Sequence, residues 1–172
     1  WDIPDAKPRN LEGPAWTGEI LAGKTLLVYA EQGFGDTIQF VRYLPLLRGR
    51  AAKIVFECQE PLVRLFRSSP VFEDVSIVCR DVDSLPDYDA QVALLSLPHL
   101  TGTELVAAET PYLVLTADRP RIANRSGGLH VGLVWAGKPS HRNDRNRSLT
   151  LSELAPLLEL SGAHFYSLQL GG

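Results

Sequence analysis

The stretch LLVYAEQGFGDTIQFVRYLPLL, residues 26–47, decides the expected fold. It joins an apolar run over 25–30, which is typical of a buried strand, to a segment over 37–47 in which apolar residues recur at helical spacing. Two glycines and an aspartate stand at the junction. The sequence therefore predicts a strand, a glycine-containing turn and a helix as the first unit of the fold.

The same alternation continues along the chain. Strands are predicted over 53–58, 75–79 and 90–95, and a helix with proline in its first turn is predicted over 61–67. Strands that alternate with helices at this spacing form β-α-β crossovers, which build a mainly parallel sheet. The expected fold class is α/β, with a Rossmann-like, mainly parallel sheet and helices on both of its faces.

Composition divides the chain into four segments. Residues 1–24, rich in proline and glycine, are expected to form an extended lead-in that lies against the body. Residues 25–115 form the Rossmann-like amino-terminal domain, and the polar stretch 116–128 is a linker. A second Rossmann-like domain begins over 129–172 and is cut short. Because the chain contains no methionine, we interpret it as a piece of a longer protein.

The second part repeats the pattern on a smaller scale. A strand is predicted over 129–137, a long polar loop follows, an amphipathic helix is predicted over 149–160, and a last strand over 163–170. Two strands and one helix are too few to bury both faces of a sheet. An exposed sheet edge favours pairing with a second copy, so a homodimer through this truncated domain is one expected assembly.

The totals exclude several classes of protein. A net charge of −3 and a pI near 5.8 leave no broad basic field for nucleic acid or an anionic membrane. The apolar stretches are much shorter than the ~20 residues of a membrane helix, so we expect no membrane span. Cys58 and Cys79 lie in apolar runs and are interpreted as buried, reduced thiols of a cytoplasmic protein.

The glycine turn stands where open parallel sheets bind their ligands, beyond the carboxyl end of a strand. Gly33 and Gly35 let a ligand approach the backbone, and the following helix offers free N–H groups to an anion. The dinucleotide fingerprint fails because Ile38 takes the place of its third glycine, and a P-loop fails because no lysine follows Gly35. Asp36 either caps the helix or takes a proton from a sugar hydroxyl as a general base.

Other residues of this turn are secondary candidates. Glu31 is either a surface or helix-pairing residue or a second carboxylate that lines the cleft. We count Glu31 and Thr37, together with the two glycines, as predicted substrate-binding residues.

A second polar cluster, GKPSHRNDRNRS over 137–148, lies between a predicted strand and a predicted helix. Its cations and hydroxyls suit phosphate oxygens, because the planar fork of donors on arginine matches them. The predicted phosphate-binding residues are Lys138, Ser140, His141 and Arg147. The alternative is a solvated loop in which Asp144 pairs locally.

Two further kinds of site are not indicated. His99 and His164 have no companion at metal-ligand spacing, so we expect no metal. The absence of a G-x-S-x-G turn from the sequence argues against a serine hydrolase. We expect no cofactor either.

The segments around both loops resemble a known family. EQGFGD and GLVWAGKPSHRNDRNRS, with LLSLPHLTGT and FYSLQLGG, are similar to the glycosyltransferase-like region that follows tetratricopeptide repeats in many bacterial proteins. That region resembles the ADP-heptose:lipopolysaccharide heptosyltransferases and, more distantly, the O-linked N-acetylglucosamine transferases. The resemblance covers nearly the whole chain from Trp16 onward.

The resemblance implies a GT-B architecture, in which one Rossmann-like domain offers the acceptor side and the other holds a nucleotide sugar. The base proposed for heptosyltransferases falls on Asp36, and Arg147 matches a cation that contacts donor phosphates, where the family often carries lysine. The implied reaction is an inverting, metal-independent transfer of a sugar to a hydroxyl on a sugar, lipid-linked or protein acceptor.

Because most of the second domain is not in the chain, we expect this piece itself to be inactive. The alternative is a non-catalytic module beside the repeats, which binds a sugar nucleotide or a protein partner.

Overall fold

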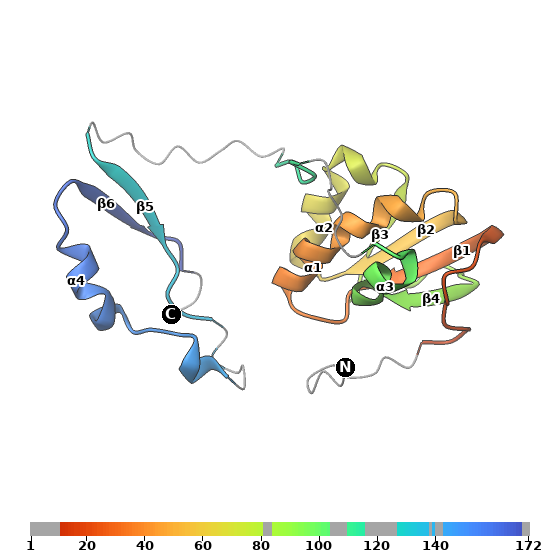
Figure 1. Cartoon of the computed structure of the whole chain (residues 1–172), viewed down its shortest axis with the longest axis horizontal. Helices are drawn as coiled ribbons and strands as arrows, with labels where there is room; N and C mark the ends of the chain where they lie inside the picture. Colours follow the sequence, from red (N-terminus) through yellow and green to blue (C-terminus); the bar gives the residue numbers. More distant parts are fainter. Residues whose placement is uncertain are drawn as a thin grey trace. The chain divides into compact units, whose positions relative to one another are not determined.

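The chain forms two compact units, of which the first ends at Ala117 and the second begins at Asp118 (Figure 1). The computed structural model describes residues 11–80, 84–103, 110–115, 127–137, 139 and 143–169. The division between the units falls in the stretch 116–128 for which the sequence predicts a linker, and residues 116–126 of that stretch lie outside the described residues.

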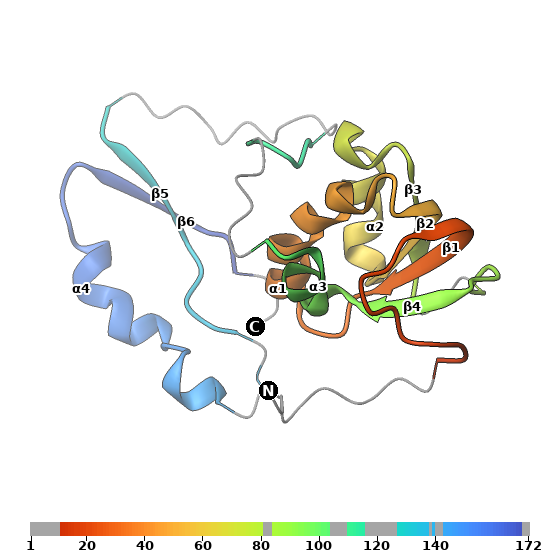
Figure 2. The same cartoon turned by 45° about the vertical axis from the view of Figure 1, so that its right-hand side comes forward.

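Unit 1 contains a four-stranded sheet in the order β3-β2-β1-β4 (Figures 1 and 2). Its strands are β1 (Leu21–Tyr29), β2 (Ala51–Cys58), β3 (Val75–Cys79) and β4 (Ala90–Ala93). All three adjacent pairs run parallel. The prediction of an α/β fold with a mainly parallel sheet is confirmed.

The helices of unit 1 follow the strands, as β-α-β crossovers require. They are α1 (Phe34–Phe40), the 3₁₀ helix η1 (Val41–Leu47), α2 (Glu60–Arg67), η2 (Pro70–Phe72), η3 (Leu94–Ser96) and α3 (Leu97–Thr101). Their buried side chains form one core with Leu26, Val28 and Phe56 of the sheet. Leu27 and Val55, which point to the opposite face, also have no exposed surface. A strand buried on both faces is typical of this fold class.

The beginning of β1 differs from the sequence prediction. The strand starts at Leu21 rather than at 25, and its register with β2 shifts between Leu21 and Thr25. Gly23, with φ of +72°, lies in this interval and weakens the strand pattern in the sequence. Upstream, Trp16 is 2% exposed and its backbone N–H donates to the Gln91 carbonyl at 2.8 Å, so this part of the lead-in lies against the sheet.

The first helix also differs from its predicted range of 37–47. It starts at Phe34 and becomes a 3₁₀ helix from Val41 onward, with Pro45 inside that segment. Proline has no N–H to donate and its ring obstructs the preceding turn, which explains why regular α-helix does not continue. The prediction is therefore correct in position but wrong in helix type over its second half.

Unit 2 contains a two-stranded parallel sheet of β5 (Leu129–Leu133) and β6 (Ala163–Ser167). Between them lie η4 (Asp144–Asn146), η5 (Leu151–Leu154) and α4 (Ala155–Leu158). Both strands end earlier than predicted, and the predicted helix over 149–160 is a short 3₁₀ turn followed by one α-helical turn. None of the residues described in unit 2 is buried, so little packing supports a longer helix.

The two cysteines are neighbours in the ladder between β2 and β3, and both are buried free thiols, as predicted. Burial raises the pKa of Cys58 to about 12, with a smaller contribution from nearby Cys79. Cys58 is therefore unreactive at neutral pH. Among the helices described, none has the length and apolar character needed to cross a membrane.

Candidate functional site

The turn after β1 places Asp36 in the first turn of α1. Gly33 is the N-cap residue, and no side chain caps the helix. The Asp36 side chain is partly exposed and makes no hydrogen bond or ion pair within the described residues. Of the two interpretations of Asp36, helix capping is not observed. The carboxylate therefore stays available at the carboxyl end of β1.

The glycines of this turn are not required by the backbone. Gly33 has an ordinary φ of −69°, and Gly35 is not among the glycines with positive φ. A Cβ at Gly35 would meet no atom within 4 Å, whereas a Cβ at Gly33 would lie 3.7 Å from Oδ2 of Asp36. Glycine in a helix costs about 1 kcal/mol relative to alanine. The open space at Gly35 instead suits the approach of a ligand.

Thr37 holds the turn from inside. Its side chain is fully buried, and its hydroxyl donates to the Gly33 carbonyl at 3.1 Å. The same hydroxyl accepts a hydrogen bond from Nε2 of Gln59 at 3.1 Å, and that nitrogen also donates to the Gln32 carbonyl at 2.7 Å. Thr37 thus ties α1 to the end of β2 and exposes no surface to a substrate.

Glu31 joins the end of β1 to the start of η3. Its carboxylate accepts hydrogen bonds from the backbone N–H groups of Leu94 and Leu95, each at 3.1 Å. Burial raises the pKa of Glu31, while backbone hydrogen bonds and the charge of Arg80 act in the opposite direction. This carboxylate is engaged within the fold, so Glu31 positions the turn.

The loop after β5 is organised by Asp144 and Ser148. The hydroxyl of Ser148 accepts from the Gly137 N–H at 2.9 Å and donates to the Asp144 carboxylate at 2.6 Å. The Asp144 carbonyl accepts from the N–H groups of Arg147 and Ser148. The local pairing considered for Asp144 is therefore present.

Arg147 lies over Gly137 in this loop. A Cβ at Gly137 would be 3.5 Å from Nε and 3.6 Å from Nη2 of Arg147. The Arg147 side chain is exposed and its guanidinium has no hydrogen bond or ion pair among the described residues. Lys138, Ser140 and His141 lie outside the described residues.

Two glutamines that are not among the predicted site residues stabilise the two turns. Gln59 acts on the turn after β1. Gln169 acts on the turn after β5: its Oε1 accepts from the N–H groups of Trp135 and Ala136, at 3.2 and 3.0 Å, and its Nε2 donates to the Ala136 carbonyl. Their positions shortly after the second strand of each unit are the one sequence signal that could have identified them.

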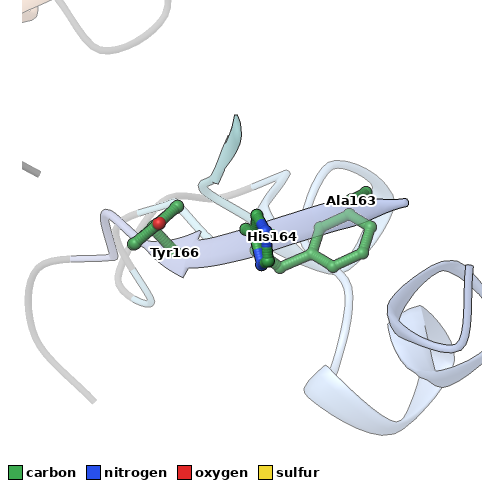
Figure 3. A pocket seen from close by; sticks show the side chains of 4 residues that line it. Ala163, His164 and Tyr166 are labelled. Carbon is green, nitrogen blue, oxygen red and sulfur yellow. The ribbon is translucent and has the colours of Figure 1, made fainter. Parts of the chain in front are cut away.

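A pocket of about 270 Å³ is lined by Ala163, His164, Phe165 and Tyr166 along β6 (Figure 3). His130 is the register partner of His164, and its Nδ1 lies 3.0 Å from the hydroxyl of Tyr166. None of the predicted site residues that the structure describes lines this pocket. Within the described ranges, no three His, Cys, Asp or Glu side chains are grouped so that they could hold a metal ion.

Comparison with known proteins shows a weak similarity to a bacterial protein. Protein FlbA of Caulobacter vibrioides is 26% identical to this chain over an alignment of 201 residues, which covers 98% of this chain and 32% of FlbA. The chain thus spans about a third of the length of the curated relative that it matches. No family model matches the chain. No solved structure matches it at the significance of the FlbA match.

Proposed function

We propose that this chain is part of a glycosyltransferase that transfers a sugar from a nucleotide-sugar donor to a hydroxyl acceptor, with inversion and without a metal. The observation that carries the proposal is the carboxylate of Asp36. It stands at the carboxyl end of the first strand, where α/β sheets bind their ligands, and no described residue engages it. The open space at Gly35 lies one residue away.

The proposed chemistry follows from this free carboxylate. Asp36 accepts the proton of the acceptor hydroxyl while the hydroxyl oxygen forms a bond to the anomeric carbon of the donor sugar. The bond from that carbon to the nucleoside diphosphate breaks, and its electron pair leaves with the phosphate. Thr37 and Glu31 hold the turn through the fold, so the base is positioned before the acceptor binds.

Arg147 is the proposed partner of the leaving diphosphate. Its unengaged guanidinium can donate to phosphate oxygens as they gain charge, which lowers the barrier to bond breaking. Lys138, Ser140 and His141 are further candidates on the same loop.

The base is tested by Asp36→Asn in the full-length parent protein, with a panel of nucleotide sugars. We expect transfer to fall by about a hundredfold or more while donor binding is unchanged. Glu60→Gln is a matched control, because Glu60 is an exposed acid in the first turn of α2. Unchanged transfer in Asp36→Asn, or a loss of equal size in Glu60→Gln, would refute the role.

The phosphate role is tested by calorimetry with UDP, GDP and ADP. We expect Arg147→Ala to weaken binding of the preferred nucleotide by about tenfold, the usual loss for a charged hydrogen bond. Arg145→Ala is the control, since Arg145 is an exposed arginine in the same loop. Equal affinities of Arg147→Ala and wild type would show that the assignment is wrong.

A second candidate is a non-catalytic module that binds a sugar nucleotide or a protein partner beside tetratricopeptide repeats. It is favoured by the exposed leucines that follow one another along η5, α4 and the next turn, namely Leu151, Leu157, Leu158 and Leu160. Clustered exposed apolar side chains favour protein contacts, including contacts with a second copy of the chain. Nucleotide binding without transfer from any donor would select this candidate.

We further propose that the parent is cytoplasmic and carries tetratricopeptide repeats before this region. Two buried, reduced cysteines support the compartment. The resemblance of the two loops to the repeat-associated glycosyltransferase-like region supports the arrangement.

A further inference from the structure

Three polar side chains at the carboxyl edge of the unit 1 sheet have buried atoms without a hydrogen-bond partner in the part of the chain that the structure describes. They are Arg80, through Nε and Nη2, Gln32, through Nε2, and Gln59, through Oε1. We call these three residues the sheet-edge cluster. Buried polar groups in folded proteins are nearly always paired, so these four orphan atoms indicate a partner that the described residues do not supply.

The backbone places the three residues next to one another. The Arg80 N–H donates to the Cys58 carbonyl at 2.9 Å, which brings the first residue after β3 beside the end of β2. Gln59 follows Cys58, and its Nε2 donates to the Gln32 carbonyl beyond the end of β1. The sheet-edge cluster therefore runs across the ends of three adjacent strands, and Gln32 lies in the same turn as Asp36.

Glu31 does not neutralise Arg80 by direct contact. Both carboxylate oxygens of Glu31 accept backbone N–H groups, from Leu94 and Leu95. Arg80 is near enough for its charge to lower the pKa of Glu31, yet the two side chains form no hydrogen bond. The Nε–Nη2 edge of Arg80 thus has no partner among the described residues, and the carboxylate beside it is already hydrogen-bonded.

The orphan atoms define the chemistry of their partner. Nε and Nη2 form one edge of the guanidinium, and this edge donates two parallel hydrogen bonds to the oxygens of a carboxylate or phosphate. Gln32 offers a third donor. Gln59 offers an acceptor, which an anion cannot satisfy but a hydroxyl can.

We propose that the sheet-edge cluster binds an acidic sugar, with its carboxylate or phosphate on Arg80 and Gln32 and a neighbouring hydroxyl on Gln59. The role of this sugar as the acceptor rests on the proposed function, in which Asp36, four residues after Gln32, is the base. The binding itself does not depend on that function. It is also separate from the donor phosphates, which we assign to the loop after β5 in unit 2.

The binding is tested on the whole 172-residue chain with glucuronate, glucose 6-phosphate and glucose. NMR signals of the arginine Nε–H groups report the contact directly, and Arg80→Lys identifies the Arg80 signal. We expect an acidic sugar to shift the Arg80 signal and glucose to leave it in place. A shift with glucuronate alone identifies a sugar acid, and a shift with glucose 6-phosphate alone identifies a sugar phosphate.

Variants then measure the contribution of the guanidinium edge. Arg80→Met should weaken binding of the acidic sugar by about tenfold to a hundredfold. Arg80→Lys keeps the charge but loses the paired donors, so it should also weaken binding, and it serves if Arg80→Met does not fold. Arg64→Met is the control, because Arg64 is an exposed arginine on α2 of the same unit.

Several results would overturn the proposal. In the NMR experiment, one is the absence of a shift of the Arg80 signal with either acidic sugar. In the binding experiments, they are equal affinity for glucose and the acidic sugars, and equal affinity for inorganic phosphate and glucose 6-phosphate. Unchanged affinity of Arg80→Lys for the acidic sugar would also overturn it. Asp36→Asn separates the two proposals, because it should abolish transfer and leave acidic-sugar binding intact. In the wild-type parent, binding of an acidic sugar without transfer from any donor would reject the enzyme and keep the sheet-edge cluster.

Discussion

The two units stabilise the turn after their first strand in the same way, but among the described residues only the turn in unit 1 lies against a buried core. In each, a glutamine shortly after the second strand reaches back to the turn after the first strand: Gln59 holds the Gln32 carbonyl, and Gln169 holds the backbone of Trp135 and Ala136. In unit 1 this turn rests on a closed core of fully buried side chains. In unit 2 no residue that the structure describes is buried.

The difference shows that a strand–turn–helix pattern in the sequence forms a regular helix only where that helix can pack against a buried core. In unit 1, α2 extends over Glu60–Arg67 and buries Leu62 and Phe66. In unit 2 the corresponding helix is reduced to η5 and the single turn of α4, although the sequence shows comparable amphipathic spacing. Most helical stability in proteins comes from burial of one face, which two strands alone do not provide.

The largest test of this comparison is a core deletion in each unit. Phe56→Ala removes a fully buried ring whose centroid lies 5.7 Å from the ring centroid of Phe66. We expect unit 1 to lose about 3–5 kcal/mol of stability. Leu157→Ala in unit 2, where the side chain is 37% exposed, should cost less than about 1 kcal/mol. Hydrogen exchange measured peptide by peptide resolves the two units. Equal losses would mean that unit 2 has a core of its own.

A second test compares the threonines that organise the two helix starts. Thr37→Val removes a buried hydroxyl with two partners, so we expect a loss of about 1–3 kcal/mol in unit 1. In unit 2, the exposed Thr150 donates its hydroxyl and backbone N–H to Glu153, and Thr150→Val should cost about 0.5–1 kcal/mol. Urea unfolding with hydrogen exchange measures both. A larger loss for Thr150→Val would contradict the ranking.

A third test uses glycines that have no positive φ. Gly35→Ala places a methyl group in open space and should stabilise α1 by about 0.5–1 kcal/mol, while lowering acceptor affinity if the ligand uses that space. Gly132→Ala in β5 would bring Cβ into steric clash with Cδ1 of Leu168, so unit 2 should be destabilised until Leu168 shifts. Thermal unfolding gives the sign of each change. Stabilisation by both substitutions would show that the contact at Gly132 is loose.

The smallest expected effects are opposite pH dependences. Burial raises the pKa of Glu31 in the folded chain above its ordinary value of 4.5. The folded chain therefore holds this proton at a higher pH than the unfolded chain does. The contribution of Glu31 to stability falls as the pH rises through the pKa of the folded state. The folded pKa of Glu153 is lowered below 4.5, chiefly by the Thr150 N–H, so its contribution falls as the pH drops. We measure the free energy of unfolding of wild type and subtract that of each variant. From pH 4 to 7 this difference should fall for Glu31→Gln and rise for Glu153→Gln. Parallel trends would contradict these assignments.

Much of the fold could be predicted because apolar runs and glycine turns act over a few residues. The strand at Val75–Cys79 has its predicted bounds, and Asp36 stands in the first turn of a helix after the first strand. The beginning of β1 was missed because Gly23 conceals the strand, and the type of the second half of the first helix was missed because of Pro45. Both errors concern single residues that change the backbone locally.

The candidate site was predicted less completely, since partners far apart in the sequence decide it. Thr37 and Glu31 were predicted to meet a substrate, but the fold engages Thr37 with Gln59 and Glu31 with the backbone of η3. Nothing in the local sequence of Arg80 distinguishes it from an ordinary surface arginine. Its unpaired edge is evident only once the ends of β1, β2 and β3 are side by side.

The sequence by itself determined the α/β class, the approximate places of the strands, and the position of a carboxylate at the first turn, because periodicity and glycine content express short-range backbone preferences. Only the tertiary structure decided the strand order, which polar side chains are used within the fold, and which ones lack partners. The physical reason is that burial removes water as an alternative hydrogen-bond partner, so the role of a polar group depends on the neighbours that the sheet brings to it.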